Sequence, residues 1–337
     1  LLGLAPEGDA PPLTREDLAA RVRDRMHLLP SWGWRLQQVP LRIHHPVWVE
    51  DPDFVIEDHI RHRVLPAPGG PAELNALMAE LEPQLLDLRH PLWQIVLVDG
   101  LGGPGITRQA LVLRIHHTLA DGAAILHTFD LLFGDSAGEL PHAETATIPE
   151  LPKKRTLLRD AVREQAHNWR EIPQLFKDTK ATFERVEAKR EEATAVVPRP
   201  MGDAPHTIFN RPGPAVRTYA RTLIPTADLQ RIRPATGATL NDVVLAIVAG
   251  SLRSYLLARD ALPEKGLVAN VPVSGDPPGT PPRQWGNRFA NFFALLHTDV
   301  EDPRERLAAI SASTAEAKAQ LAVQGHDTLN AWLDRMP

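Results

Sequence analysis

The sequence contains no cysteine, and this absence removes several kinds of chemistry at once. Disulfide bonds, thiolate metal sites and a cysteine nucleophile are all excluded. A basic tract is missing too: 37 Lys and Arg residues stand against 42 Asp and Glu residues, which gives a net charge of −5. Because neutralisation of phosphates dominates the affinity for nucleic acid, we expect no nucleic-acid partner.

Long hydrophobic runs are also missing. No apolar run approaches the roughly 20 residues that a transmembrane helix needs, and the best, residues 243–250, is predicted to be part of a core helix. No signal peptide opens the chain, so we expect a cytoplasmic protein. The first residue is Leu and not Met, so we expect the natural N-terminus to lie upstream.

What is present is typical of a globular protein, with 43% hydrophobic and 23% charged residues. At 337 residues the chain is too long for one ordinary core, so two lobes are expected. A Pro- and Ala-rich stretch at 141–152 is typical of a linker, and the charged residues 154–192 predict a helical crossover broken near Pro173. The predicted division is a first lobe over 1–150, a crossover over 151–205, and a second lobe over 206–337 whose C-terminal end is expected to be incomplete.

Strands and helices are mixed in both halves, which indicates an α/β or α+β protein. Hydrophobic periodicity and capping residues predict helices over 15–29, over 72–82, from 226, over a long and mostly buried stretch from 239, and over 302–322. Strands are expected over 39–50, 94–99, 109–115, 217–224 and 266–274, with a strand-rich run over 286–300. The strands 94–99 and 109–115 are expected to pair as a hairpin.

The chain is organised around residues 111–133, where a buried strand meets an amphipathic helix. His116 and His117 follow the strand, and Asp121 and Gly122 open the helix. Three interpretations of these residues are open. A metal site is disfavoured because adjacent histidines do not easily ligate one ion. A structural cluster is plausible because Asp121 stands where an N-cap would. Acid–base chemistry is favoured because the chain has no G-x-S-x-G elbow and no cysteine, so direct transfer with a histidine base fits better.

HHTLADG resembles the HHxxxDG motif of the CoA-dependent, chloramphenicol acetyltransferase-like superfamily. The surroundings resemble one of its members, the bacterial wax ester synthase/diacylglycerol acyltransferase family. The resemblance rests on Pro91-Leu92-Trp93, on HPVWVEDPDF (45–54), GATLNDVVLAIVAGSLRSYLL (237–257), NVPVS (270–274) and GN (286–287).

The resemblance implies a two-lobed chloramphenicol acetyltransferase-like fold, with mixed sheets flanked by helices and an active-site tunnel between the lobes. It implies transfer of a fatty acyl group from acyl-CoA to a long-chain alcohol or diacylglycerol. His117 would be the general base, His116 would support it, and Asp121 would anchor the loop, with an arginine as its expected partner. Gly122 would allow close approach of the backbone. No cofactor is implied, since acyl-CoA is a substrate.

The resemblance also covers an Asn-Asp pair at Asn241-Asp242. Asp242 stands three residues after Thr239, so a capping role is favoured for it. Asn241 is a candidate for the tunnel and the oxyanion. Pro91, Leu92 and Trp93 are expected to be packing or tunnel wall. Family members usually extend further at both ends, so we expect a longer natural protein.

Two alternatives to this function stay open. One keeps the fold but uses another acceptor or a carrier-protein donor, as condensation-type enzymes do. The other is a non-catalytic lipid-binding homologue. Peripheral contact with a membrane or lipid droplet is expected from the neutral-lipid products, and Trp32 and Trp34 are candidates for it, although a buried position is favoured. His44 and His45 are interpreted as structural.

Overall fold

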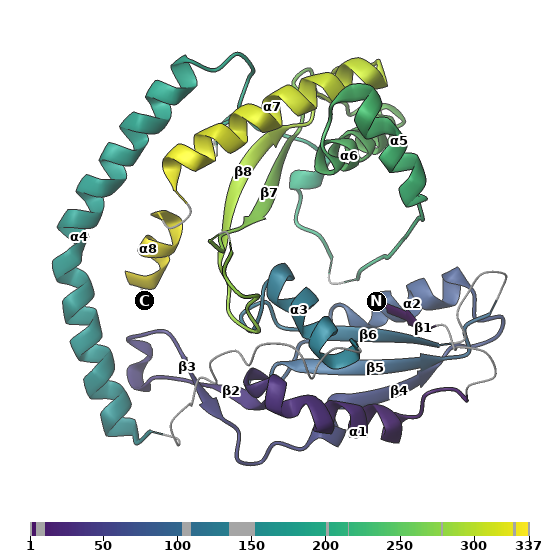
Figure 1. Ribbon diagram of the computed structural model, residues 1–337, viewed down its shortest axis with the longest axis vertical. Helices are drawn as coiled ribbons and strands as arrows, with labels where there is room; N and C mark the ends of the chain where they lie inside the picture. Colours follow the sequence, from purple (N-terminus) through teal and green to yellow (C-terminus); the bar gives the residue numbers. More distant parts are fainter. Residues whose placement is uncertain are drawn as a thin grey trace.

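The first half of the chain forms a sheet with helices, and one very long helix leads from it to a helix-rich second half (Figure 1). The computed structural model describes residues 2–4, 11–102, 109–134, 152–199, 202–214, 216–277, 279–325 and 328–335. The α-helices are α1 (Arg15–Arg25), α2 (Pro71–Leu81), α3 (Gly122–Phe133), α4 (Lys154–Glu191), α5 (Thr226–Thr236), α6 (Leu240–Leu257), α7 (Pro303–Gln324) and α8 (Thr328–Arg335). The strands are β1 (Leu2–Leu4), β2 (Trp34–Gln37), β3 (Val47–Glu50), β4 (Ile60–Val64), β5 (Trp93–Asp99), β6 (Gln109–Ile115), β7 (Val268–Ser274) and β8 (Phe289–Leu295).

The sheet of the first half has the strand order β1-β6-β5-β4. β5 and β6 pair antiparallel and β4 pairs parallel with β5, so the predicted hairpin is confirmed. The residues 95–98 and 110–112 are buried, which explains the continuous apolar runs in these central strands. The register places Trp93 opposite Ile115, at the end of β6. His116 and His117 follow β6 directly, so they lie at this end of the sheet.

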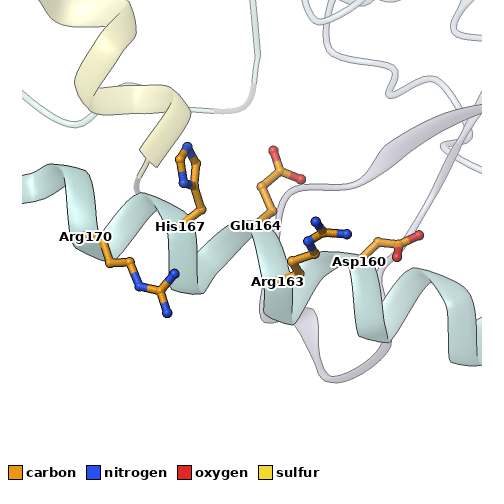
Figure 2. Close-up of a pocket in the computed structure, with 5 residues that line it drawn as sticks. All are labelled: Asp160, Arg163, Glu164, His167 and Arg170. Atoms are coloured by element: carbon orange, nitrogen blue, oxygen red, sulfur yellow. The ribbon is translucent and has the colours of Figure 1, made fainter.

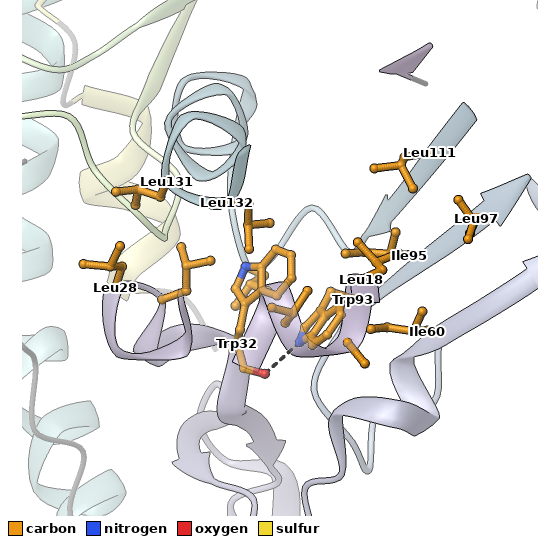
Figure 3. Close-up of a cluster of buried hydrophobic side chains, with 14 residues drawn as sticks. Leu18, Leu28, Trp32, Ile60, Trp93, Ile95, Leu97, Leu111, Leu131 and Leu132 are labelled. Atoms are coloured by element: carbon orange, nitrogen blue, oxygen red, sulfur yellow. Dashed lines mark hydrogen bonds between the residues drawn. The ribbon is translucent and has the colours of Figure 1, made fainter. Parts of the chain in front are cut away.

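The core of the first half is centred on two tryptophans (Figure 3). The rings of Trp32 and Trp93 lie 4.1 Å apart, and Trp93 Nε1 donates a hydrogen bond of 2.7 Å to the carbonyl of Trp32. Trp32 and Trp34 are 1% and 2% exposed, so the favoured buried position is right and the membrane-interface alternative for them is wrong. Pro91, Leu92 and Trp93 are buried as well, as expected for packing residues.

The capping box predicted at Thr14 and Asp17 opens α1, although the helix ends at Arg25 and a 3₁₀ turn follows. The strand expected over 39–50 is wrong for most of its length. Only Val47–Glu50 is a strand, because a 3₁₀ turn occupies Pro40–Arg42; its partner β2 was not predicted. His45 Nε2 lies 3.2 Å from the carbonyl of Leu333, in keeping with a structural role.

The long helix α4 runs without a break through Pro173, so the predicted break is wrong. Proline removes one backbone donor, but buried residues on both sides, Asn168 and Leu175, hold the helix in place. The helix packs against α7 and α8, which lie on its inner side, toward the rest of the molecule, in Figure 1. The linker expected over 141–152 lies, except for Pro152, outside the described residues.

The second half contains the antiparallel pair β7–β8, covered on one face by α6 and α7. The helices α5 and α7 begin where predicted, and Asp302 caps α7 through the backbone N–H groups of Arg304 and Glu305. The strand expected over 217–224 is wrong: this exposed segment pairs with no strand in the described chain. β7 is only partly buried, because one face of the pair carries no layer formed by described residues.

The predicted burial of α6 is also wrong. Of its 18 residues 22% are buried, and the exposed large side chains include Val244, Ile247, Val248 and Tyr255. Among the described residues α6 is the one helix whose length and composition would allow it to cross a membrane, with a mean hydropathy of 1.4. The core helix of a globular protein meets the same criteria.

The hydrophobic clusters of the two halves are separate. Those of the first half draw on residues 4–133 and those of the second on 197–321. This separation agrees with a two-lobed protein. The lobe boundaries at 150 and 205 stay a prediction.

Candidate active site

The two histidines lie in the turn between β6 and α3. The backbone N–H of His116 donates to the carbonyl of Leu92 at 2.9 Å, which ties the turn to the end of the sheet. The N–H of Leu119 returns to the carbonyl of His116, also at 2.9 Å, and closes the turn. Asp121 then caps α3, with Oδ1 accepting from the N–H of Ala124 at 3.1 Å. The N-cap predicted at Asp121 is confirmed.

The ring of His116 contacts a residue of its own turn, Thr118. Its Nδ1 accepts a hydrogen bond of 3.2 Å from the backbone N–H of Thr118 and lies 2.8 Å from Thr118 Oγ1. A backbone N–H can only donate, so Nδ1 of His116 carries no proton. This arrangement stabilises the turn and fits the supporting role expected for His116.

The ring of His117 is held by a residue from the other half of the chain. Asn287 Nδ2 donates to the carbonyl of His117 at 2.8 Å, and Asn287 Oδ1 lies 2.9 Å from His117 Nδ1. The carbonyl can only accept, so it fixes the orientation of the amide and turns Oδ1 toward the ring. His117 Nδ1 must therefore carry the proton, and Nε2 presents a free lone pair.

Asp121 has the arginine partner that was expected but could not be identified. Arg283 Nη2 donates to Asp121 Oδ2 at 2.6 Å, and the N–H of Arg288 donates to the same oxygen at 2.8 Å. Burial by itself would raise the pKa of the Asp121 carboxyl, but the hydrogen bonds from Arg288, Arg283 and Ala124 outweigh it and hold that pKa below its ordinary value. Asp121 thus stays ionised while 6% exposed.

Arg283 is the centre of the loop that reaches the turn. Its Nε donates to Asp276 Oδ1 at 2.6 Å, and its Nη1 donates to the carbonyl of Gly286 at 2.8 Å. Nη2 also donates to Asp276 Oδ2 at 3.1 Å, so the guanidinium binds Asp276 through two parallel hydrogen bonds, a strong geometry for arginine, and joins it to Asp121. Burial would lower the pKa of Arg283, but the hydrogen bonds to Asp276 and Asp121 raise it above its ordinary value.

Backbone contacts complete the junction. The N–H of Gly286 donates to the carbonyl of Leu119 at 2.7 Å, and the N–H of Asp121 donates to the carbonyl of Gly286 at 3.2 Å. Gly286 has φ of 82°, a conformation that favours glycine. A Cβ at Gly122 would meet no described atom within 4 Å, so protein packing does not require glycine there.

The Asn-Asp pair lies at the start of α6. Asp242 Oδ2 accepts from the N–H of Thr239 at 2.9 Å, and Oδ1 accepts from Thr314 Oγ1 at 2.7 Å. Asp242 is 2% exposed, and its capping role is confirmed. The Asn241 side chain is exposed, and no hydrogen bond joins it to His117 within the described part of the chain.

Sequence reasoning missed Asn287, Arg283 and Asp276 as site residues. Gly286-Asn287 was noted for its resemblance to the family but given no role. The contact between His117 and Asn287 spans 170 residues, and that between Asp121 and Arg283 spans 162 residues. No local spacing connects residues so distant, so only the folded chain reveals the pairs.

Among the described residues no group of three or more His, Cys, Asp or Glu side chains could hold a metal ion. An open hollow along α4 carries charges of both signs, and Figure 2 shows its side chains projecting from this one helix. It lies away from the histidines and is lined by Asp160, Arg163, Glu164, His167 and Arg170. We interpret it as a solvated helix face.

The fold and the site define the class: a two-lobed, chloramphenicol acetyltransferase-like protein with an HHxxxDG histidine where its halves meet. The first condensation domain of the CDA synthetase shares the fold, with a TM-score of 0.52 at 19% identity over 93% of this chain and 66% of that chain. Within this class, the chain belongs to the wax ester synthase/diacylglycerol acyltransferase family. The profile of the family's catalytic domain matches residues 2–244, and that of its C-terminal domain matches residues 285–337. The predicted family and fold class are confirmed.

The chain is also similar to two individual proteins of this family. A protein of Mycobacterium tuberculosis H37Rv, provisionally named a diacylglycerol O-acyltransferase, is 33% identical over 98% of this chain and 69% of its own length. The wax ester synthase/diacylglycerol acyltransferase of Marinobacter aquaeolei VT8 is 29% identical, with a TM-score of 0.57 over 94% of this chain and 65% of that chain. The chain spans about two thirds of the length of both.

Proposed function

We propose that the protein is an O-acyltransferase that moves a fatty acyl group from acyl-CoA to a long-chain alcohol or diacylglycerol. The products would be a wax ester or a triacylglycerol. Family membership supports the reaction class, and the name of the Mycobacterium tuberculosis relative supports diacylglycerol as one acceptor. The observation that carries the proposal is the contact between His117 and Asn287, which leaves Nε2 of the ring free to accept a proton.

The proposed reaction is direct transfer. His117 Nε2 removes the proton from the acceptor hydroxyl as its oxygen attacks the thioester carbonyl. The tetrahedral intermediate collapses, the carbon–sulfur bond breaks, and the imidazolium returns the proton to the CoA thiolate. Asn287 stabilises the imidazolium through Nδ1 and keeps the ring in place. Asp121 acts through Arg283, which holds the loop carrying Asn287 against the turn.

The test measures CoA release from palmitoyl-CoA with hexadecanol or with dioleoylglycerol. His117→Ala should lower the rate by roughly 10²–10⁴-fold, since a positioned acid–base group contributes about that much. His116→Ala is the matched control in the same turn and should retain more activity. A His117→Ala protein that keeps the wild-type rate would refute the mechanism.

Other outcomes separate the alternatives. Transfer from an acylated carrier protein but not from palmitoyl-CoA would indicate a condensation-type enzyme. Stoichiometric lipid binding without turnover by the full-length protein would indicate a non-catalytic homologue. The role of Asn241 at the oxyanion stays a prediction. Asn241→Ala should lower the rate if Asn241 donates to the oxyanion, and an unchanged rate would refute that role.

We also propose a cytoplasmic protein that contacts membranes or lipid droplets peripherally. The exposed apolar side chains of α6 support contact with a lipid surface. Flotation with liposomes should recover the wild-type protein, and Val244→Glu together with Val248→Glu should reduce the recovered fraction. If no protein floats with neutral or anionic liposomes, the peripheral role is wrong.

A further inference from the structure

The loop between β7 and β8 makes an aromatic contact with the first half of the chain, in addition to the ion pair of Arg283. The ring of Trp285 lies 5.2 Å from the ring of Trp34, with an angle of 75° between the two planes. Such an edge-to-face pair is favourable, because the positive edge of one ring meets the negative face of the other. In Figure 1 the connection between β7 and β8 descends toward the first half. The contact therefore joins the two halves of the chain.

Trp34 provides a rigid surface for this contact. It is 2% exposed and begins β2, where it pairs with Glu50 of β3. Its backbone N–H donates to the carbonyl of Ser31, the residue before the central tryptophan of the core, Trp32. Side chains that are packed in a core stay close to one rotamer. The ring of Trp34 is thus held in place independently of Trp285.

Trp285 itself is not a core residue. Its ring is 40% exposed, and none of the hydrophobic clusters in the described part of the chain includes it. A side chain that is buried to this limited extent contributes little to the stability of either half. Loss of the ring should therefore change the thermal midpoint of the protein only slightly, so its effect on the site can be measured in a folded protein.

The position of Trp285 in the loop connects its ring to the catalytic histidine. The carbonyl of Trp285 accepts a hydrogen bond of 3.3 Å from Arg283 Nη1, and Asn287, which contacts His117, is two residues further along. Arg283 and the backbone of Gly286 attach the loop to the turn that carries the histidines. A segment attached to one element can still pivot about it. The ring of Trp285 adds an attachment to a different element, β2, and this fixes the direction of the loop.

We propose that Trp285 is a positioning residue: its ring, docked against Trp34, holds the loop so that Asn287 Oδ1 stays within hydrogen-bond distance of His117 Nδ1. The proposal rests on the proposed function, which it deepens by naming a residue that acts on the base through Asn287. The side chain of Trp285 takes no part in the proton transfer itself. Its substitution should therefore lower kcat and leave the affinity for both substrates unchanged.

Trp285→Ala removes the ring and provides the kinetic test. A misplacement of about 1 Å can lower the rate about 10²-fold, and Arg283 still attaches the loop in this variant, so we expect kcat to fall roughly tenfold. The KM values for palmitoyl-CoA and hexadecanol should stay level. Trp285→Phe keeps an aromatic edge for Trp34 and should restore kcat to within about twofold of the wild type. CoA release at varied concentrations of each substrate measures both constants.

Trp169→Ala is the matched control, since it removes a tryptophan that is 68% exposed on α4. This control should leave kcat and both KM values unchanged. Loss of kcat in Trp285→Ala that Trp285→Phe does not restore would overturn the proposal. A rise in KM with unchanged kcat would also overturn it, because the ring would then act on substrate binding and not on the base.

A second measurement reads the contact without requiring turnover. The tautomer of a histidine is set by the hydrogen bond that its other nitrogen makes, and NMR of the protein with isotope-labelled histidine distinguishes the two tautomers. His117 should be protonated at Nδ1 in the wild type and in Trp169→Ala. Trp285→Ala should shift it toward the tautomer protonated at Nε2, in the same direction as Asn287→Ala. The spectrum of His117→Ala identifies the signal.

The two measurements separate the outcomes. A Trp285→Ala protein with the wild-type kcat and the wild-type tautomer of His117 would overturn the proposal. A shifted tautomer in Trp285→Ala, together with no acyl transfer by the full-length wild-type protein, would leave the positioning role standing and refute the proposed function instead.

Discussion

The starts of α3 and α6 each carry a buried aspartate, and the two aspartates differ in what they do. Asp121 is the N-cap of α3 and is 6% exposed, and Asp242 is the third residue of α6 and is 2% exposed. Asp121 accepts from Arg283 and from the backbone of Arg288, both in the other half of the chain. The partners of Asp242 lie in its own half and are neutral: the backbone N–H of Thr239 and the hydroxyls of Ser311 and Thr314.

Both carboxyls have a pKa below the ordinary value, for different reasons. Burial opposes ionisation in each case. For Asp121 the backbone of Arg288 and the guanidinium of Arg283 overcome it, and for Asp242 the hydroxyls of Thr314, Thr239 and Ser311 do so. A charged partner makes Asp121 a link between the halves, whereas neutral partners make Asp242 an internal cap.

Replacing Arg283 with methionine should have the largest effect. It leaves Asp121 and Asp276 without their shared cation and frees the loop that carries Asn287. Removing one partner of a fully buried pair costs about 3–5 kcal/mol; Arg283 keeps some exposure, so we expect about 2–3 kcal/mol in the free energy of unfolding. The rate of acyl transfer should fall as well, because Asn287 would no longer hold the ring of His117 in place. Denaturant unfolding and CoA release measure the two effects.

Arg231→Met provides the control. Arg231 pairs with Asp228 at the surface of α5, and exposed pairs contribute little. The control should leave both stability and activity unchanged. An Arg283→Met protein that behaves like the control would show that the ion pair does not join the halves.

Asparagine in place of each aspartate sharpens the comparison. Asp121→Asn should cost about 1.5–3 kcal/mol, since a charge-assisted hydrogen bond is lost and Arg283 and Arg288 can only donate. Asp242→Asn should cost about 0.5–1.5 kcal/mol, because the hydroxyls of Ser311 and Thr314 can turn to accept from the new amide. Denaturant unfolding of both variants at neutral pH gives the two values. Equal costs would contradict the assigned difference.

The same variants predict a pH dependence. The pKa of Asp121 in the folded protein lies below its ordinary value of 3.8, so the unfolded chain binds the proton first as the pH falls. The stabilisation is present above 3.8 and is lost as the pH falls through the folded pKa. The stability gap between wild type and Asp121→Asn should therefore narrow with decreasing pH, which unfolding between neutral pH and about pH 3 can measure. A stability difference that widens with decreasing pH would contradict the lowered pKa of Asp121 in the folded protein.

Local features of the fold were predictable from the sequence. The hairpin of β5 and β6, the capping box at Thr14 and the N-caps at Asp121 and Asp302 follow from short-range patterns. Burial was less predictable. α6 was expected to be mostly buried because its apolar residues are dense, but density does not say which neighbours cover a helix. The segment 217–224 has a strand-like pattern but no strand partner in the described chain.

The site was predictable only in part. His116, His117 and Asp121 carry a motif within six residues, and the fold brings all three into one turn. Their partners Asn287 and Arg283 come from the other half, and asparagine and arginine are too common to stand out by type. The role of Asn241 in the tunnel stays a prediction, whereas the neighbouring Asp242 accepts a hydrogen bond from Thr314 of α7.

The smallest effects are expected from the hydroxyl partners of Asp242. Thr314→Val removes one donor from Asp242 and keeps the side-chain shape. Thr314 Oγ1 donates to Asp242 Oδ1 at 2.7 Å, whereas Ser311 Oγ donates to Oδ2 at a longer 3.1 Å. We expect Thr314→Val to cost about 1 kcal/mol in the free energy of unfolding and Ser311→Ala to cost less. CoA release should not change in either, because the cap of α6 does not join the halves. A loss of activity in Thr314→Val without loss of stability would instead connect the start of α6 to the reaction. Asp242 would then no longer differ from Asp121 in being a purely internal cap.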